Sequence, residues 1–494
     1  MYPIKNLKNS FRFLIICNLT SFLFSQINTP NQSLVFEKYL KANNSNQFEI
    51  SSGFNFIYNS QFILNNGHPN IDNNSEIYSI GYFSKFNSTV FKYSNSWLML
   101  EIEPYSLTHS KIFNSKAINS TQMVVNNHLN NKSHSEKESG FRHSRIIIHY
   151  NGLGVSYGKM SHWWGPGFHS AIALSSNAPS QATYAIGSFK DLRIGKFGFG
   201  AQIIAMPYNS LSDVNIYFSG LKSNITYYSN PIIRIGMHRT YLSGDFANLD
   251  QITNSTSRWT IEDAALLVIE PLFGQSKKDL AYTSPGTPGF DLWDEILTGY
   301  VKIIFPNSNL ELYADIASDD NRANITDLRA HWDHTLAYQL GLTKKINYGE
   351  INYFLGVEYL TTRVSNTFNP NFYRGNPNTP SYYFKGEYDY FSFKGRRMGA
   401  HSGSSSDDFI FLLGMSFNKS LFTGYWNLER HALKTEKFPE IKSELNFMYQ
   451  YRLSKIPISY FIAYEYEKIN NYEYIQQKLS TSSLFWFGFS INIK

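Results

Sequence analysis

The feature that most constrains this sequence is an alternation of apolar and polar residues in segments of about ten residues. In each clear case the apolar residues hold one parity, and the charged residues fall on the other. Successive side chains of a β-strand point to opposite faces, so each segment predicts a strand with one apolar face and one polar face. The clearest segments are 310–317, 352–359, 444–453, 458–467 and 485–494.

Such strands can cross a membrane only in a closed sheet, because every backbone N–H and C=O must be paired in hydrocarbon. No stretch after residue 25 is long and apolar enough for a transmembrane helix, which needs about eighteen apolar residues or more. Charged residues make up only 17% of the chain and aromatic residues another 17%, which suits a wall with one apolar face. We therefore predict an all-β fold, a transmembrane antiparallel β-barrel over residues 48–494 with about 16–18 strands.

A soluble β-sandwich or β-helix would also alternate. The alternation that runs to residue 494 favours the barrel, whose last strand must pair with its first. Short turns at 151–152 and 347–349 contrast with long connections, as in barrels with one loop-rich face. The long connections are expected at 109–138, 161–182, 245–292 and 365–405. Within one of them, residues 257–270 form a candidate helix that could plug or cap the lumen.

The N-terminus predicts export. Lys5, Lys8 and Arg12 precede an apolar stretch at 13–24 that is too short to span a bilayer, so residues 1–25 are expected to be a cleaved signal peptide. Residues 26–47 then form a short N-terminal segment with a second candidate helix at 31–42. The only cysteine, Cys17, lies inside the signal peptide, where Ile15 and Ile16 argue against a lipid anchor. The mature chain is therefore expected to have no disulfide and no cysteine-ligated metal.

The net charge excludes a large class of partners. Removing the three basic residues of the signal peptide from a total of 44 leaves 41, against 38 acidic residues, so the mature net charge is +3. That balance does not suit nucleic acid, which needs a concentrated basic face. Export and a barrel together predict a monomer in the outer membrane of a Gram-negative bacterium, in contact with outer-membrane lipid.

The most unusual motif is Trp163-Trp164-Gly165-Pro166-Gly167, in which two indole rings precede a turn. Large flat rings suit stacking on the C–H faces of sugars, and His162 and Asn177 could then bond the hydroxyl groups. An interfacial tryptophan anchor, or packing inside a plugged lumen, would explain the same residues without a ligand.

This motif, between Gly158 and the segment Leu174-Ser175-Ser176-Asn177-Ala178-Pro179, resembles the capsule assembly Wzi family. The stretches 241–244, 311–315 and 395–399 are similar as well. The resemblance implies a non-catalytic outer-membrane barrel with lectin activity that helps to assemble or retain capsular polysaccharide at the cell surface. Capsular or other surface polysaccharide is then the expected partner.

A late glycine-rich loop, 395–408, is the second candidate binding segment. Arg396, Arg397 and His401 would suit acidic sugars, because a guanidinium group binds a carboxylate with two hydrogen bonds. An exposed, flexible loop is the alternative interpretation of the same glycines.

Two other functions stay open. The first is a porin or substrate-specific channel, and the second is a glycan hydrolase that uses a pair of carboxylates such as Glu311 and Asp315. No nucleophile elbow or zinc-protease motif occurs, and His331 with His334 makes a weak metal signal, so we expect no catalytic residue, no metal and no cofactor. The inward carboxylates are instead predicted to pair with Lys302, Arg452 and other bases; they are Glu101, Glu103, Glu311, Asp315, Glu358 and Glu465.

Overall fold

The computed structural model describes the barrel and part of its connections. It covers residues 53–70, 72, 75–113, 135–209, 215–244, 294–319, 336–363, 382–383, 391–434, 436–453 and 456–493. The predicted signal peptide, the 26–47 segment, both candidate helices and the pair His331 and His334 lie outside these residues, so those expectations stay predictions. Among the described residues, no helix is long and apolar enough to span a membrane.

The strands form one antiparallel sheet of 21 segments, and three of these segments continue a neighbour as a single strand. In this way β3 (Leu98–Ile102) continues as β4 (Pro104–Ile112), β5 (Lys137–Phe141) as β6 (Ser144–Tyr150), and β8 (Gln181–Ser188) as β9 (Leu192–Ile194). The barrel therefore has 18 strands, within the predicted range.

The other strands of the barrel are uninterrupted. They are β1 (Gly53–Asn66), β2 (Gly81–Ser94), β7 (Leu153–Met160), β10 (Phe197–Asn209), β11 (Asn215–Tyr227), β12 (Ile232–Gly244), β13 (Asp294–Phe305), β14 (Leu310–Asp319), β15 (Leu336–Tyr348), β16 (Ile351–Thr361), β19 (Asp407–Phe417), β20 (Ser420–His431), β21 (Glu440–Arg452), β22 (Ile458–Asn470) and β23 (Leu479–Ile493). A two-stranded hairpin of β17 (Ser392–Phe393) and β18 (Arg396–Arg397) is separate from the barrel sheet.

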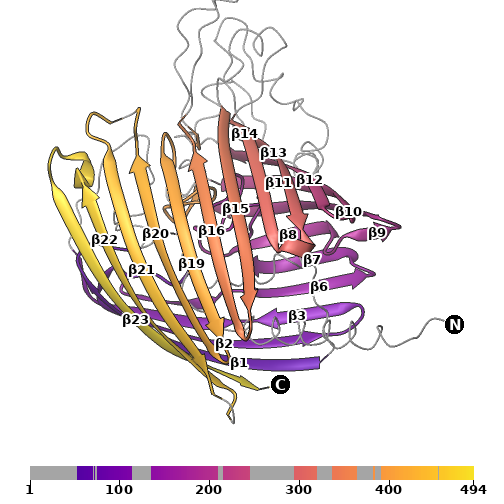
Figure 1. Cartoon of the computed structure of the whole chain (residues 1–494), viewed down its shortest axis with the longest axis horizontal. Coiled ribbons are helices and arrows are strands. Elements are labelled where there is room, and N and C mark those ends of the chain that lie inside the picture. Colours follow the sequence, from indigo (N-terminus) through magenta and orange to yellow (C-terminus); the bar gives the residue numbers. More distant parts are fainter. Residues whose placement is uncertain are drawn as a thin grey trace, which may run out of the picture.

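The barrel closes where its last strand meets its first. Strand β23 pairs with β1 in a continuous antiparallel register that runs from Phe56 opposite Ile493 to Asn66 opposite Ser483. Figure 1 shows this seam, with the yellow end of the chain beside the indigo strands. Closure leaves no edge strand with unpaired backbone groups, which is the condition for a sheet to stand in hydrocarbon.

The two faces of the wall differ as the alternation predicts. Phe447, Ile462 and Phe487 point outward and are exposed, whereas Glu444 and Glu465 on the same strands as the first two point inward and are buried. All five segments singled out in the sequence follow this parity. The outer face is therefore an apolar belt, and the polar face lines the lumen.

Short and long connections lie at opposite ends of the barrel, because successive strands run in opposite directions. Asn151 and Gly152 both have positive φ, at 51° and 92°, as a two-residue type I′ hairpin turn requires. The turn predicted at 347–349 is shifted: Asn347 and Tyr348 belong to β15, and Gly349 with Glu350 forms the turn. The strands of the barrel leave long connections at 113–136, 161–180, 245–293 and 362–406, close to the predicted bounds. Further connections at the same end are 67–80, 320–335, 432–439 and 471–478.

A charge on the outer face tests the assignment of the two faces. Ile462→Arg should destabilise the folded barrel in a lipid bilayer by about 2–4 kcal/mol, because the guanidinium group would face hydrocarbon. Denaturant unfolding in vesicles, followed by tryptophan fluorescence, measures this cost. Glu350→Arg, in an exposed turn, is the control and should cost little. An equal cost for both variants would contradict the lipid-facing assignment.

Candidate functional site

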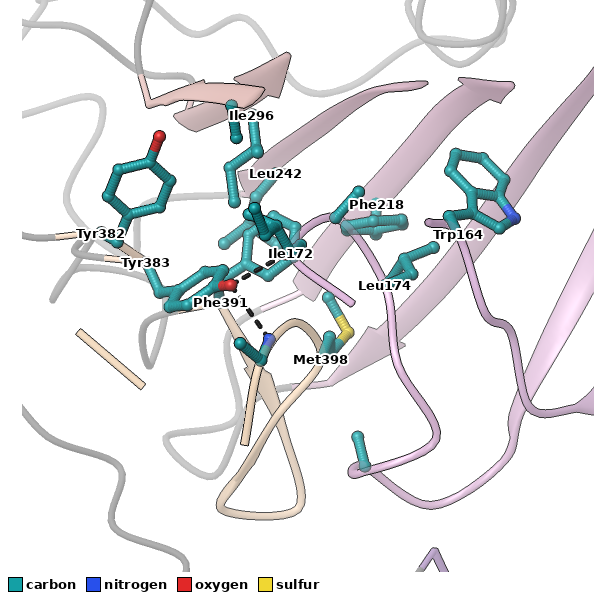
Figure 2. Packing of buried hydrophobic residues seen from close by; sticks show 14 of the residues in the cluster. Trp164, Ile172, Leu174, Phe218, Leu242, Ile296, Tyr382, Tyr383, Phe391 and Met398 are labelled. Carbon is teal, nitrogen blue, oxygen red and sulfur yellow. Dashed lines mark hydrogen bonds between the residues drawn. The ribbon is translucent and has the colours of Figure 1, made fainter. Parts of the chain in front are cut away.

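Two connections from the loop-rich end fold into the lumen. We call residues 161–180 together with 382–383 and 391–406 the loop plug. Their side chains form a buried apolar cluster with inward-facing residues of strand β8 and of strands β10 to β16. Figure 2 shows Trp164 and Leu174 from the first segment and Met398 from the last, packed near Phe218 and Leu242 of the wall. The lumen is therefore occupied by packed protein near these strands.

Backbone groups join the two parts of the loop plug. The Ser175 amide donates to the carbonyl oxygen of Met398 at 2.6 Å. The Tyr383 hydroxyl donates to the carbonyl oxygen of Ile172 at 2.8 Å and accepts from the Ala400 amide at 2.9 Å (Figure 2). These bonds satisfy buried polar groups that would otherwise oppose burial of the loops.

The two adjacent tryptophans have different environments. Trp164 is 1% exposed, and its ring lies so close to β11 that a Cβ atom at Gly220 would sit 2.7 Å from Cζ3. Its ring centroid is 5.7 Å from that of His238. Trp163 is half-buried, and its indole N–H donates to the carbonyl oxygen of Gly167 at 3.0 Å. Packing inside the lumen therefore accounts for Trp164, whereas Trp163 is only partly buried.

The smaller residues of the motif divide in the same way. Gly165 and Pro166 keep some exposed surface, and Gly167 is buried. The His162 ring is half-buried and contacts the Thr183 hydroxyl at 3.1 Å. Burial, followed by the charge of Lys222, lowers the pKa of His162 to about 3, so this imidazole is neutral near pH 7.

The candidates for polar contacts Asn177, Arg396 and Arg397 are parts of the loop plug. The buried Asn177 side chain donates to the carbonyl oxygen of Arg397 at 3.0 Å. The Arg396 guanidinium lies 4.7 Å from the centre of the Tyr78 ring, a cation–π contact. Arg397 lies against Gly403, where φ is +81° and any side chain would collide with the guanidinium group. An exposed, flexible loop is the wrong interpretation of residues 395–408, because these residues are buried.

Glu358 holds the first segment of the loop plug against the wall. Its carboxylate accepts the backbone N–H groups of Phe168, His169 and Ser170 at 2.7, 3.3 and 2.8 Å. Gln339 of β15 donates to the same carboxylate at 2.6 Å, and the Tyr313 hydroxyl donates as well. The predicted partner of this carboxylate was a basic side chain; the structure supplies backbone amides instead.

Glu76 does the same from the 67–80 connection. It accepts the Ser180 backbone N–H at 2.7 Å and is bonded by the hydroxyl groups of Ser180 and Ser75. Burial alone would raise the pKa of Glu76, but the charge of Arg142 and these hydrogen bonds outweigh burial and lower it. The 161–180 segment is thus bound by carboxylates at two places, near its middle by Glu358 and at its end by Glu76.

The predicted ion pairs of the lumen form at three positions. Glu101 lies 2.8 Å from Lys92 and 3.0 Å from Arg145, and Lys302 lies 2.6 Å from Glu311. Glu103 lies 3.2 Å from Arg142. Two other inward carboxylates, Asp315 and Glu465, have no basic partner within the described part of the chain. Asp315 lies beneath the motif instead, near Gly165.

A cluster of histidines and carboxylates that no sequence motif predicts adjoins this region. His169 and His401 each place Nε2 3.4 Å from Oδ2 of Asp408, and His401 also lies 3.5 Å from Glu429. Burial opposes a charge on His169, but the Asp408 carboxylate outweighs it and raises the pKa of His169 to about 9. His169 is more than two hundred positions away from His401 and Asp408 in the sequence, so only the folded barrel brings these residues together.

A closed antiparallel sheet with an apolar outer face and a polar, loop-filled lumen defines an outer-membrane β-barrel. Wzi of Escherichia coli has the same fold: the two superpose with a TM-score of 0.58 over 92% of this chain and 88% of that one, at 12% sequence identity. Wzi is described as a carbohydrate-binding β-barrel involved in group 1 capsule assembly. OccAB2 of Acinetobacter baumannii superposes with a TM-score of 0.46 at 7% identity, over 90% of this chain and 98% of that one. No family model and no curated protein matches the chain.

Removing the Glu358 carboxylate should release the 161–180 segment. Glu358→Ala leaves three amide donors without their acceptor, which should cost about 3 kcal/mol or more if they stay buried. We expect proteases added to the folded protein to cut within 161–180 in this variant and not in the wild type. Glu350→Ala is the matched control. Full protection of the segment in Glu358→Ala would show that the carboxylate is dispensable.

The two tryptophans should differ in their effect on stability. Trp164→Ala should cost about 3–5 kcal/mol, because it opens a cavity in a buried cluster. Trp163→Ala should cost less than about 2 kcal/mol, because half-buried side chains contribute less. Denaturant unfolding of the two variants gives both numbers. The opposite order would contradict the described packing.

Proposed function

We propose that this chain is a non-catalytic outer-membrane protein that binds capsular or other surface polysaccharide and helps to assemble or retain it at the cell surface. The observation that carries the proposal is the loop plug inside a barrel that shares the fold of a carbohydrate-binding protein. The sequence resemblance to the Wzi family points the same way. A monomer in outer-membrane lipid is part of the proposal.

The loop plug favours polysaccharide binding over the function of a channel. A channel needs a continuous polar path, whereas here residues 161–180 and 391–406 are mostly buried and joined by hydrogen bonds. Moving them aside would expose a cluster of twenty buried residues to water. A loop plug packed against the wall in this way suits a surface that presents loops to a large ligand that does not enter the barrel.

The long connections are the side on which a polysaccharide would bind. In bacterial barrels short turns face the periplasm and longer loops face the outside. The start of β1 and the end of β23 lie at the short-turn end of this barrel. The loop plug enters the lumen from the other end, so it would face the capsule.

Trp163 is the residue that we propose to stack on sugar. It is partly exposed, and its N–H is held by Gly167, which fixes the ring orientation. The neutral His162 and the partly exposed Gly165 and Pro166 would complete the contact face. Trp164, with the buried Gly167, Asn177, Arg396 and Arg397, would act by positioning that face, because each is used inside the loop plug.

The hydrolase alternative has less support. Glu311 is bound to Lys302 at 2.6 Å, and Asp315 is fully buried beneath the motif. A catalytic carboxylate pair must flank the bond that it cleaves. Turnover that is abolished by Glu311→Gln, with glycan binding unchanged, would favour the hydrolase.

Cell-attached and released polysaccharide distinguish these functions. In an encapsulated host that lacks the gene, we expect less attached and more released polysaccharide, and rescue by the wild type. Trp163→Ala should not rescue, and its purified form should bind the polysaccharide at least about tenfold more weakly, since truncating an aromatic hot-spot residue costs about 2 kcal/mol.

The matched control is Trp97→Ala. Trp97 is 54% exposed and lies in the short turn between β2 and β3, at the opposite end of the barrel from the loop plug. This variant should rescue fully. A channel function replaces this proposal if the capsule is unchanged without the gene and the purified barrel conducts ions steadily in planar bilayers.

A further inference from the structure

Three side chains from separate elements converge at one point of the lumen, and the proposed function does not use them. His169 comes from the 161–180 segment, His401 from the 391–406 segment, and Asp408 from the start of strand β19. One ligand atom of each lies within 4.8 Å of the other two. His401 and Asp408 are 3% and 2% exposed, so the group is shielded from bulk water on the side of the wall.

The spacing matches the coordination of a small metal ion. Both imidazole Nε2 atoms lie 3.4 Å from the same oxygen, Oδ2 of Asp408. A tetrahedral ion with bonds of about 2.0–2.1 Å holds neighbouring ligand atoms roughly 3.3–3.4 Å apart. One ring nitrogen of each histidine also lies within 4.8 Å of the other, so a common ion can lie between the two rings.

The carboxylate is oriented for this role. The Asn427 side chain donates to Oδ1 of Asp408 at 2.7 Å, and its amide nitrogen also lies 3.3 Å from Nε2 of His169, a contact that a bound ion would replace. Oδ2 of Asp408 is directed at the two imidazoles. Oδ2 is buried and accepts no hydrogen bond among the described residues. A hydrogen bond to the second oxygen is the usual outer-shell support of a ligating carboxylate.

A fourth oxygen lies next to the group. Oε1 of Glu429 is 3.5 Å from Nε2 of His401 and is held by Lys442 at 3.1 Å. It can complete a tetrahedral set or bond to a water molecule in the fourth position. Glu429 is also paired with His431 at 2.8 Å, so Asp408 is the carboxylate that supplies negative charge for a cation.

Ion pairing or hydrogen bonding without a metal is the competing explanation, because imidazole N–H groups can donate to a carboxylate oxygen. The two rings meet edge to face, with centroids 4.8 Å apart at an angle of 84°, and both direct Nε2 at Oδ2 of Asp408. One divalent ion could bond both nitrogens and this oxygen together, and zinc binding distinguishes the two explanations.

We propose that His169, His401 and Asp408 bind one divalent transition-metal ion, and that zinc suits their nitrogen and carboxylate ligands best. The ion would join both segments of the loop plug to strand β19 of the wall. A disulfide cannot do so, because the only cysteine is Cys17 in the predicted signal peptide. The proposal departs from the sequence-based expectation of no metal and does not depend on polysaccharide binding.

Zinc binding to the folded barrel tests the site. Tag-free protein in detergent is stripped with a chelator, dialysed and titrated with zinc chloride, and bound zinc is measured by elemental analysis and calorimetry. We expect the wild type to bind zinc and to melt at a higher temperature with zinc than without. His169→Gln, His401→Gln and Asp408→Asn should each weaken zinc binding by more than about 100-fold, since outer-shell changes alone cost about 10- to 100-fold.

Two further variants separate a metal site from a structural role. His149→Gln replaces a buried histidine of β6 and should bind zinc as the wild type does. Asn427→Ser should weaken binding by about 10- to 100-fold without abolishing it. Correct folding of each variant is checked by its heat-modifiable mobility on a gel.

The proposal is overturned if the wild type binds no zinc, or if any of the three ligand variants folds and binds zinc as tightly as the wild type. It is also overturned if zinc raises the melting temperature of the Asp408→Asn variant as much as that of the wild type. A variant that does not fold is replaced by His401→Ala and His169→Ala, to which the same outcomes apply.

Discussion

The pairing of backbone N–H and C=O groups is the constraint on which this structure depends. In hydrocarbon each unpaired group costs several kcal/mol, so the wall has no stable open form. The pairing of β1 with β23 removes the last two edges of the sheet. Once the sheet is closed, its inner face becomes a polar enclosure in which charged side chains can stay at modest cost.

Carboxylates on this inner face organise the segments that enter the lumen. Glu358 binds the backbone amides of the 161–180 segment near its middle, and Glu76 binds the same segment at its end. A carboxylate that accepts several backbone N–H groups needs no basic partner, because the amides stabilise its charge. The packing of Trp164 on Gly220 then adds apolar contact to a position that the hydrogen bonds have set.

The sequence predicts the wall well and the lumen poorly, for a physical reason. Alternation in a segment such as 444–453 reports which face of a strand is apolar, and that information is local. The position of Trp164 cannot be predicted from local sequence, because a flat indole ring can pack equally well on a sugar and on a glycine. The glycine on which it packs, Gly220, can be identified only when the register of β11 is known.

The same reason explains why the histidine cluster was missed and the partner of Glu358 was predicted wrongly. His169 belongs to the 161–180 segment and Asp408 to strand β19, and no spacing in the chain links them. Glu358 looks in the sequence like any inward carboxylate, and its acceptance of amide groups depends on the path of a loop far away in the chain. Signals from residue type alone cannot separate these cases.

The seam between the first and last strands also governs the order in which the molecule can assemble. Contacts along it join His68 to Ser480, which are 412 positions apart. Folding slows as contacting residues become more distant along the chain, because the loop entropy is lost before the contact forms. No partial chain can form this seam. One edge of β1 therefore stays unpaired until β23 has been exported. A nascent barrel of this kind needs that edge protected from other chains throughout its passage to the membrane.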